Sequence, residues 1–143
     1  MQYRPMTIKD YSAIVELWMR SEGVRLRDAD SRDGIAKYLS RNPGLSFVAE
    51  SAGDIVGTIM AGHDGKRGYI QHLSVESTYR RSGIGKALVR LCLEALKREG
   101  IQKSHLMILV ENEAAKRFWY SLGWVERTDI KLYSYINDSD ENA

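Results

Sequence analysis

The stretch from Tyr69 to Gly100 restricts the fold more than any other part of the chain. It predicts a strand over Tyr69–Val75, then a glycine-containing turn, then a long amphipathic helix that ends before Gly100. The turn brings two arginines and two glycines to the point where the helix begins. Free N–H groups and the positive end of the helix dipole meet there, so this turn is suited to a phosphate.

The spacing Arg80-x-x-Gly83-x-Gly85 separates three kinds of phosphate motif. A P-loop needs glycine at the position of Arg80 and serine or threonine at that of Ala87. A dinucleotide-binding fingerprint needs a third glycine at Leu88 and repeated parallel strand–helix units. Both patterns fail, which argues against nucleotide binding. On spacing alone, an ordinary strand-to-helix turn stays an alternative.

The turn resembles the pyrophosphate-binding motif, Gln/Arg-x-x-Gly-x-Gly/Ala, of the GNAT N-acetyltransferases. A second segment, 112–124, resembles the family's later signature, Asn-x-x-Ala-x-x-Phe-Tyr-x-x-x-Gly-Phe, in the family's order and separation. The resemblance implies that the turn holds the pyrophosphate of acetyl-coenzyme A. It also implies that a bulge in the fourth strand frees backbone groups for the pantetheine arm. The implied cofactor-binding residues are Leu73, Ser74, Val75, Arg80, Arg81, Ser82, Gly83, Ile84, Gly85, Lys86, Asn112 and Phe118.

Composition is ordinary for a globular protein. The 143 residues predict one domain over 1–143, and a net charge of +2 is too small to imply nucleic acid. The single cysteine, Cys92, excludes an internal disulfide framework and fits a reducing cytoplasm. It lies in an apolar helix stripe, so we expect a buried side chain. The apolar run Leu106–Val110 is far too short for a membrane span.

The periodicity of the whole chain predicts an α/β fold, with a mixed, largely antiparallel sheet of about seven strands and helices on both faces. Strands are expected over 2–6, 45–50, 55–62, 69–75, 105–110, 124–127 and 130–136. Helices are expected over about 7–22, 31–41, 82–99 and 112–122. The continuous apolar run in 105–110 favours a central strand that is covered on both faces, and residues 137–143 are expected to form a polar tail.

The resemblance implies direct attack of a neutral amine on the thioester carbonyl. A base must take the proton of the amine, and His72 is the best-placed titratable side chain. Glu111 could instead orient a water. The family usually protonates the leaving thiolate with a tyrosine at the position that Trp119 occupies here. Tyr120 is a candidate acid, and unaided departure of the thiolate is the alternative. The three histidines lack paired ligand spacing, so no metal is expected.

The function hypothesis is therefore an acetyl-coenzyme A-dependent N-acetyltransferase acting on a primary amine of a small molecule, peptide or protein. The alternative is a catalytically weak sensor or interaction domain that binds acyl-coenzyme A. Trp119, which stands where the family usually has tyrosine, is the feature that supports this alternative. The sequence does not identify the acceptor: Arg25, Arg27 and Arg32 could attract an acidic one or simply be solvated. Many members of the family pair, so a homodimer is possible; no membrane partner is expected.

Overall fold

The structure, a computed structural model, describes residues 1–143 and contains one sheet with the strand order β1-β2-β3-β4-β5. The first four strands form an antiparallel meander, and β5 lies parallel to β4. The sheet is therefore mixed and largely antiparallel, as predicted. The strands are β1 (Gln2–Pro5), β2 (Phe47–Ser51), β3 (Asp54–His63), β4 (Gly68–Val75) and β5 (Ser104–Leu106).

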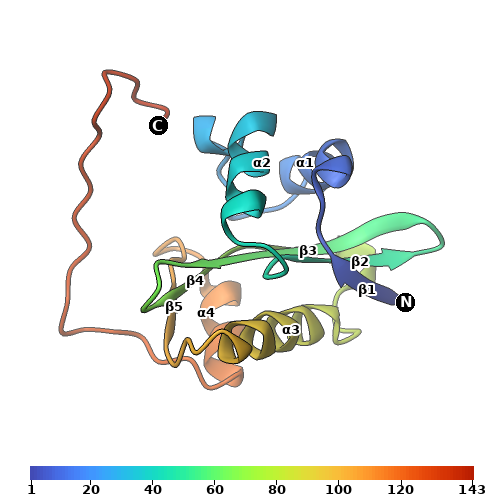
Figure 1. Ribbon diagram of the computed structural model, residues 1–143. Coiled ribbons are helices and arrows are strands. Elements are labelled where there is room, and N and C mark those ends of the chain that lie inside the picture. Colours follow the sequence, from blue (N-terminus) through green and yellow to red (C-terminus); the bar gives the residue numbers. More distant parts are fainter.

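Four α-helices cover the two faces of the sheet, and Figure 1 shows α1 and α2 on one face and α3 and α4 on the other. They are α1 (Tyr11–Met19), α2 (Arg32–Arg41), α3 (Ile84–Arg98) and α4 (Glu113–Ser121). Short 3₁₀ turns η1 (Ile8–Asp10), η2 (Asp28–Asp30) and η3 (Ser77–Tyr79) precede α1, α2 and α3. None of the helices combines the length and the apolar character that crossing a bilayer requires.

Local sequence explains where the helices begin and end. The Ser31 side chain accepts a hydrogen bond from the Gly34 amide at 3.1 Å, which caps the start of α2. The α3 helix ends before Gly100, whose φ of +83° suits a residue without a Cβ. The amide of Ile101 then bonds back to the Leu96 carbonyl at 3.0 Å.

The core has two parts, one on each side of the sheet. The larger part lies between the sheet and the α3–α4 layer and includes Leu88, Cys92 and Trp119. The smaller part lies between the sheet and the α1–α2 layer and includes Ile14, Trp18 and Ile35. The predicted burial of Cys92 is confirmed: its Sγ lies 3.1 Å from the Leu45 carbonyl, and desolvation raises the pKa of the thiol to about 12.

The prediction of about seven strands is wrong, because the sheet has five. The two segments expected as strands 124–127 and 130–136 pair with no other strand, and residues 125–136 take part in no backbone hydrogen bond. The segment predicted as a central strand over 105–110 is also different: β5 ends at Leu106, and it forms an edge of the sheet. Alternating or continuous apolar residues indicate extended backbone, but they do not determine its partner.

Candidate functional site

The turn between β4 and α3 presents a row of backbone donors. No backbone or side-chain acceptor of the chain pairs with the N–H groups from Arg81 to Lys86. Arg81 and Gly83 have positive φ angles of +65° and +83°. These angles turn the chain into the first turn of α3, where Ser82 and Gly83 are exposed. Free amides at the N-terminal end of a helix form an anion-binding site.

The cations around this turn have no carboxylate partners within the chain. Arg81 and Lys86 are exposed and take part in no ion pair, and Arg80 makes only a long contact of 3.5 Å from Nε to the Val75 carbonyl. Three positive charges therefore surround the free amides. The predicted site residues from Arg80 to Lys86 lie together in one turn that presents free amides.

The second sequence signature packs directly on the first. A Cβ added at Gly85 would lie 3.2 Å from Cζ of Phe118, so α4 contacts the first turn of α3 at this glycine. Asn112 caps α4 by accepting a hydrogen bond from the Ala115 amide at 3.0 Å. Its Nδ2 would lie only 2.7 Å from a Cβ added at Gly23, so Asn112 also packs against Gly23 in the segment that follows α1. Phe118 and Asn112 thus border the turn through packing and capping.

The fourth strand carries the bulge that the sequence resemblance implies. Thr58 of β3 pairs with Ser74, whereas Met60 pairs with Gln71, so one residue of β3 faces two of β4. His72 lies at the bulge with a φ of +52°. Thr58 Oγ1 donates a hydrogen bond to the His72 carbonyl at 2.9 Å and accepts one from Trp18 Nε1 at 2.9 Å. This buried chain of bonds fixes the bulge.

The His72 side chain forms a pair with a carboxylate that the sequence analysis missed. Its Nε2 lies 2.7 Å from Oδ1 of Asp30, and each side chain is only 13% exposed. The imidazole also packs against Trp18, with ring centroids 4.6 Å apart. Burial of Asp30 disfavours its charged form, but hydrogen bonds from His72 and the Arg27 amide outweigh this effect, so the pKa of Asp30 lies below its usual value.

A small cleft lies between α1 and the end of β4, beside the glycine turn. Its volume is about 280 Å³, and its lining includes Ser21, Val75 and Arg80. The Ser21 and Ser74 hydroxyls are hydrogen-bonded to each other, and Ser74 is buried. Arg20 Nη2 and Glu76 Oε2 form an ion pair of 2.6 Å on its wall, and this hydrogen bond lowers the pKa of Glu76. The cleft therefore lies between the end of α1 and the segment from Val75 to Arg80.

Side chains on β4 alternate between the two faces. Leu73 and Val75 pack against the core on the α3–α4 side, as expected for apolar residues whose backbone serves the site. His72 and Ser74 contact residues of the α1–α2 side, Asp30 and Ser21 respectively. The sequence position of each candidate on the strand therefore determines the face on which it acts.

The two aromatic candidates at the end of α4 lie in different environments. Trp119 is 8% exposed and packs edge-on against Phe118 and Trp124, with centroid distances of 5.2 and 5.0 Å. Tyr120 is 81% exposed, and none of its side-chain atoms is hydrogen-bonded to the chain. The neighbouring residue thus points away from the protein, as the rotation of about 100° per helical residue requires.

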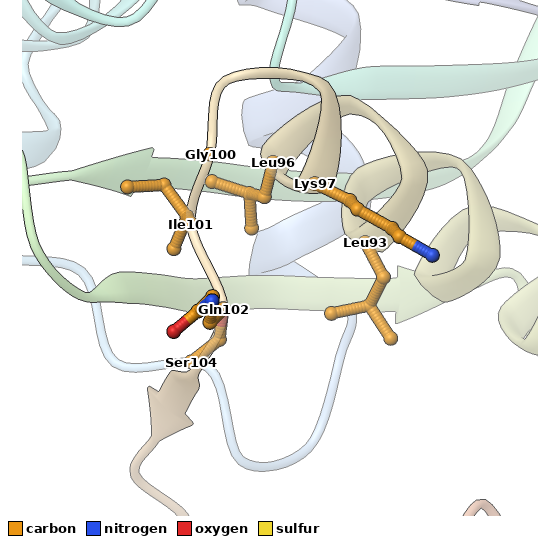
Figure 2. Close-up of a pocket in the computed structure, with 7 residues that line it drawn as sticks. All are labelled: Leu93, Leu96, Lys97, Gly100, Ile101, Gln102 and Ser104. Atoms are coloured by element: carbon orange, nitrogen blue, oxygen red, sulfur yellow. The ribbon is translucent and has the colours of Figure 1, made fainter.

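Another pocket lies at the opposite end of α3 from the glycine turn. Figure 2 shows Leu93, Leu96 and Lys97 of α3 on one side and the segment 100–104 on the other. Its volume is about 680 Å³, but it contains no histidine, carboxylate or glycine-turn amide. Its position separates it from the bulge and the free amides. Nowhere in the chain do three or more His, Cys, Asp or Glu side chains gather as potential metal ligands.

The sequence analysis missed Asp30, Trp18 and Thr58 as parts of the site. Trp18 fits a core position of an amphipathic helix, and Thr58 fits a buried strand, so neither carries a functional pattern. Asp30 lies at the end of a link without periodicity and reaches His72 across 42 residues of sequence. The only local signal was the concentration of acidic residues Asp28 and Asp30 before a serine cap.

Comparison with known proteins identifies the family. The model of the acetyltransferase (GNAT) family matches residues 11–124, which include both sequence signatures. The chain therefore belongs to the GNAT acetyltransferase family. An acetyltransferase of Sodalis glossinidius is 33% identical over 132 residues, which cover 92% of each chain.

Two solved structures show the same fold at low identity. Ard1 from Thermoplasma volcanium superimposes with a TM-score of 0.77 at 22% identity and covers 87% of this chain and 82% of its own. The PaiA N-acetyltransferase from Thermoplasma acidophilum, solved in complex with coenzyme A, has a TM-score of 0.77 at 22% identity and covers 90% and 92%. The α/β architecture of this chain is thus that of the family.

Proposed function

We propose that this protein transfers the acetyl group of acetyl-coenzyme A to a primary amine. The observation that carries the proposal is the row of free amides from Arg81 to Lys86, which lies next to the bulge in β4 and is surrounded by unpaired cations. A diphosphate matches such a site in charge and in hydrogen bonding. The complex of a GNAT relative with coenzyme A supports the choice of ligand.

The bulge positions the reactive end of the cofactor. An extended pantetheine arm can pair with strand backbone as an added strand would, and a bulge leaves one residue of β4 outside the regular ladder. The amide of Leu73 is our candidate donor to the oxyanion that forms when the amine attacks the carbonyl. One such donor lowers the activation free energy by about 3 kcal/mol. Close placement of amine and thioester contributes much of the remaining acceleration.

His72 is the candidate base. An ionised carboxylate can only accept hydrogen bonds, so the Asp30 Oδ1 contact places the imidazole hydrogen on Nε2 and leaves Nδ1 able to take a proton. The amine nitrogen forms its bond to the carbonyl carbon and loses a proton to Nδ1. The carbon–sulfur bond then breaks, and the coenzyme A thiolate leaves.

The structure favours departure of the thiolate without a tyrosine acid. Trp119, at the position where the family usually has tyrosine, is buried among aromatic rings, and Tyr120 faces solvent. A thiol with a pKa only moderately above neutrality, near ~8.5 for a free cysteine, is a fair leaving group. Water can protonate it after release.

Release of free thiol from acetyl-coenzyme A, measured with a panel of amines, tests the proposal. We expect amine-dependent release that falls by roughly 100-fold or more in His72→Gln, because general base catalysis typically contributes that much. A matched control is His63→Gln, since His63 pairs with Glu99 by 2.7 Å at a distant turn.

The second candidate function is an acyl-coenzyme A sensor with little turnover. The absence of a tyrosine from the position of Trp119 favours it. It predicts that acetyl-coenzyme A binds with wild-type affinity while no amine releases thiol. The affinity for acetyl-coenzyme A and the amine-dependent release of thiol, measured together, therefore distinguish the two functions.

A further inference from the structure

Two exposed side chains of β4 stand on the side of the sheet that α1 and α2 cover. Tyr69 is 44% exposed, and Gln71 is also exposed. Gln71 pairs with Met60, whose side chain belongs to the core on the α1–α2 side, and residues directly opposite in a sheet point to the same face. Tyr69 shares that face because side chains along a strand alternate with a period of two. The two helices therefore leave part of this face of β4 open.

An imidazole on the neighbouring strand joins these two side chains. His105 of β5 lies opposite Tyr69 in the parallel register, and the centroids of the two rings are 6.0 Å apart with a tilt of 43°. Tyr69, Gln71 and His105 are named here the β4–β5 face. A phenol, an amide and an imidazole carry no fixed charge, so this face suits a flat, weakly polar group better than a phosphate or a carboxylate.

The β4–β5 face begins beside the proposed base. Ile70 and Leu73 both pack on the α3–α4 side of the sheet. The two residues between them, Gln71 and His72, lie on the opposite side, where the His72 ring contacts α1 and η2. At about 3.3 Å per strand residue, Tyr69 lies roughly 10 Å from His72 along β4. A molecule whose amine meets His72 can therefore extend its other end over Tyr69.

The Tyr38 hydroxyl of α2 indicates that a partner is missing next to this face. Its oxygen is buried without a hydrogen-bond partner, and a Cβ added at Gly62 of β3 would lie 2.7 Å from it. A buried polar group without a partner is unfavourable and rare. Burial raises the pKa of Tyr38, and the Gln71 side chain partly offsets this effect, which places the Gln71 amide close by. A ligand that orders the exposed Gln71 amide would let it pair with the Tyr38 hydroxyl.

From these observations we propose that the acceptor of this protein is a primary amine that carries an aromatic ring, with the amine at His72 and the ring on Tyr69 and His105. The assignment rests on the proposed function, for which it names the class of substrate. The nitrogen bonds to the acetyl carbon, its proton passes to Nδ1 of His72, and the carbon–sulfur bond breaks. The products are the N-acetylated amine and coenzyme A. The ring contacts hold the far end of the acceptor and therefore act mainly through KM.

The first test measures thiol release from acetyl-coenzyme A with 4-phenylbutylamine, its saturated analogue 4-cyclohexylbutylamine, and butylamine. We expect kcat/KM for the aryl amine to exceed that for butylamine by about 10-fold or more, and that for the saturated analogue by roughly 3-fold, because an aromatic pair adds to simple burial. Equal values for the three amines would overturn the proposal. No release with any amine would overturn the proposed function, and the acceptor class with it.

Variants of Tyr69 test where the ring binds. Tyr69→Ala should lower kcat/KM for 4-phenylbutylamine to about the value for butylamine, whereas Tyr69→Phe keeps the ring and should keep the preference. The matched control is Tyr133→Ala, which removes a tyrosine that is 87% exposed and lies outside the sheet. It should leave the ratio between the two amines unchanged. A preference that survives Tyr69→Ala would overturn the placement of the ring.

Amide chemical shifts give a readout that needs no turnover. The protein is saturated with coenzyme A and titrated with 4-phenylbutylamine to millimolar concentration. We expect changes at the amides of Tyr69 and His105 and at the side-chain amide of Gln71, and smaller changes there with butylamine. Changes centred on Leu93 and Lys97, or no change at all, would overturn the proposal.

Discussion

His72 adopts a backbone conformation, with φ of +52°, that residues with a Cβ rarely occupy. Such strain persists only where the surrounding structure determines it, and it is concentrated at functional sites. Here the Thr58 hydroxyl holds the His72 carbonyl, and the Asp30 carboxylate holds its imidazole. The main chain and the side chain of His72 are thus both held, which suits the base role that we propose for it.

The Asp30 carboxylate should contribute a pH-dependent part of the stability. Its folded pKa is lowered, so its contribution is fully present above the unfolded value of about 3.9 and is lost as the pH falls through the folded pKa. We expect Asp30→Asn to reduce the free energy of unfolding by about 1–3 kcal/mol at pH 6. The difference from wild type should shrink below pH ~4.

Urea unfolding over this pH range measures both quantities. Asp33→Asn, at an exposed carboxylate in the first turn of α2, is the matched control and should show little effect at either pH. A difference between Asp30→Asn and wild type that stays constant down to pH ~2 would contradict the hydrogen bond of the ionised Asp30 carboxylate with His72.

Replacing Trp119 tests whether a tyrosine at this position could act as the general acid. Its ring is buried and packs against Phe118 and Trp124, so Trp119→Tyr should lose packing and about 1–3 kcal/mol of stability. Because the site directs this side chain into the core, we expect no gain in kcat. A variant with a higher kcat would show instead that a tyrosine here reaches the thiolate.

At the scale of elements, the glycine turn leads directly into the first turn of α3, with Gly83 as the N-cap. Gly83 has a φ of +83°, and a Cβ there would meet no atom of the chain within 4 Å. Gly65, in the turn between β3 and β4, has a φ of +95° and equally open surroundings. The two glycines therefore share a left-handed backbone conformation, but only Gly83 lies at the free amides.

This comparison gives a matched pair of variants. Gly83→Val and Gly65→Val should each cost about 1–2 kcal/mol of stability, because both force a left-handed residue. Only Gly83→Val should weaken coenzyme A binding, by 10-fold or more in calorimetry. Equal coenzyme A affinities for the two variants would contradict binding of the cofactor at the glycine turn. Gly85 is less suitable for this test, because a Cβ there would press on Phe118 and also disturb packing.

The elements that were predicted well depend on local signals. The capped start of α2, the glycine turn and the stripe of α3 could be found from the sequence because neighbouring residues specify them. The number of strands could not, since apolar residues in 124–136 indicate extended chain without specifying whether it joins the sheet. The pairing of His72 with Asp30 is equally long-range and depends on how η2 lies over β4.

At the scale of the whole molecule, the free amides and the pocket of about 680 Å³ lie at opposite ends of α3. The N-terminal end of α3 carries the free amides and lies beside Val75, at the end of the strand that holds the bulge. The C-terminal end of α3 lines the pocket beside β5. A pocket of about 680 Å³ has the volume of a small-molecule site, since such sites have volumes of about 300–1,000 Å³. The two ends therefore give opposite predictions for the cofactor.

Amide chemical shifts of the full-length protein during titration with coenzyme A decide between the two ends of α3 most directly. We predict that the largest changes fall on the amides from Arg81 to Lys86, with further changes on Leu73 and Val75. Changes centred on Leu93, Lys97 and the segment 100–104, with the glycine turn unaffected, would contradict the account.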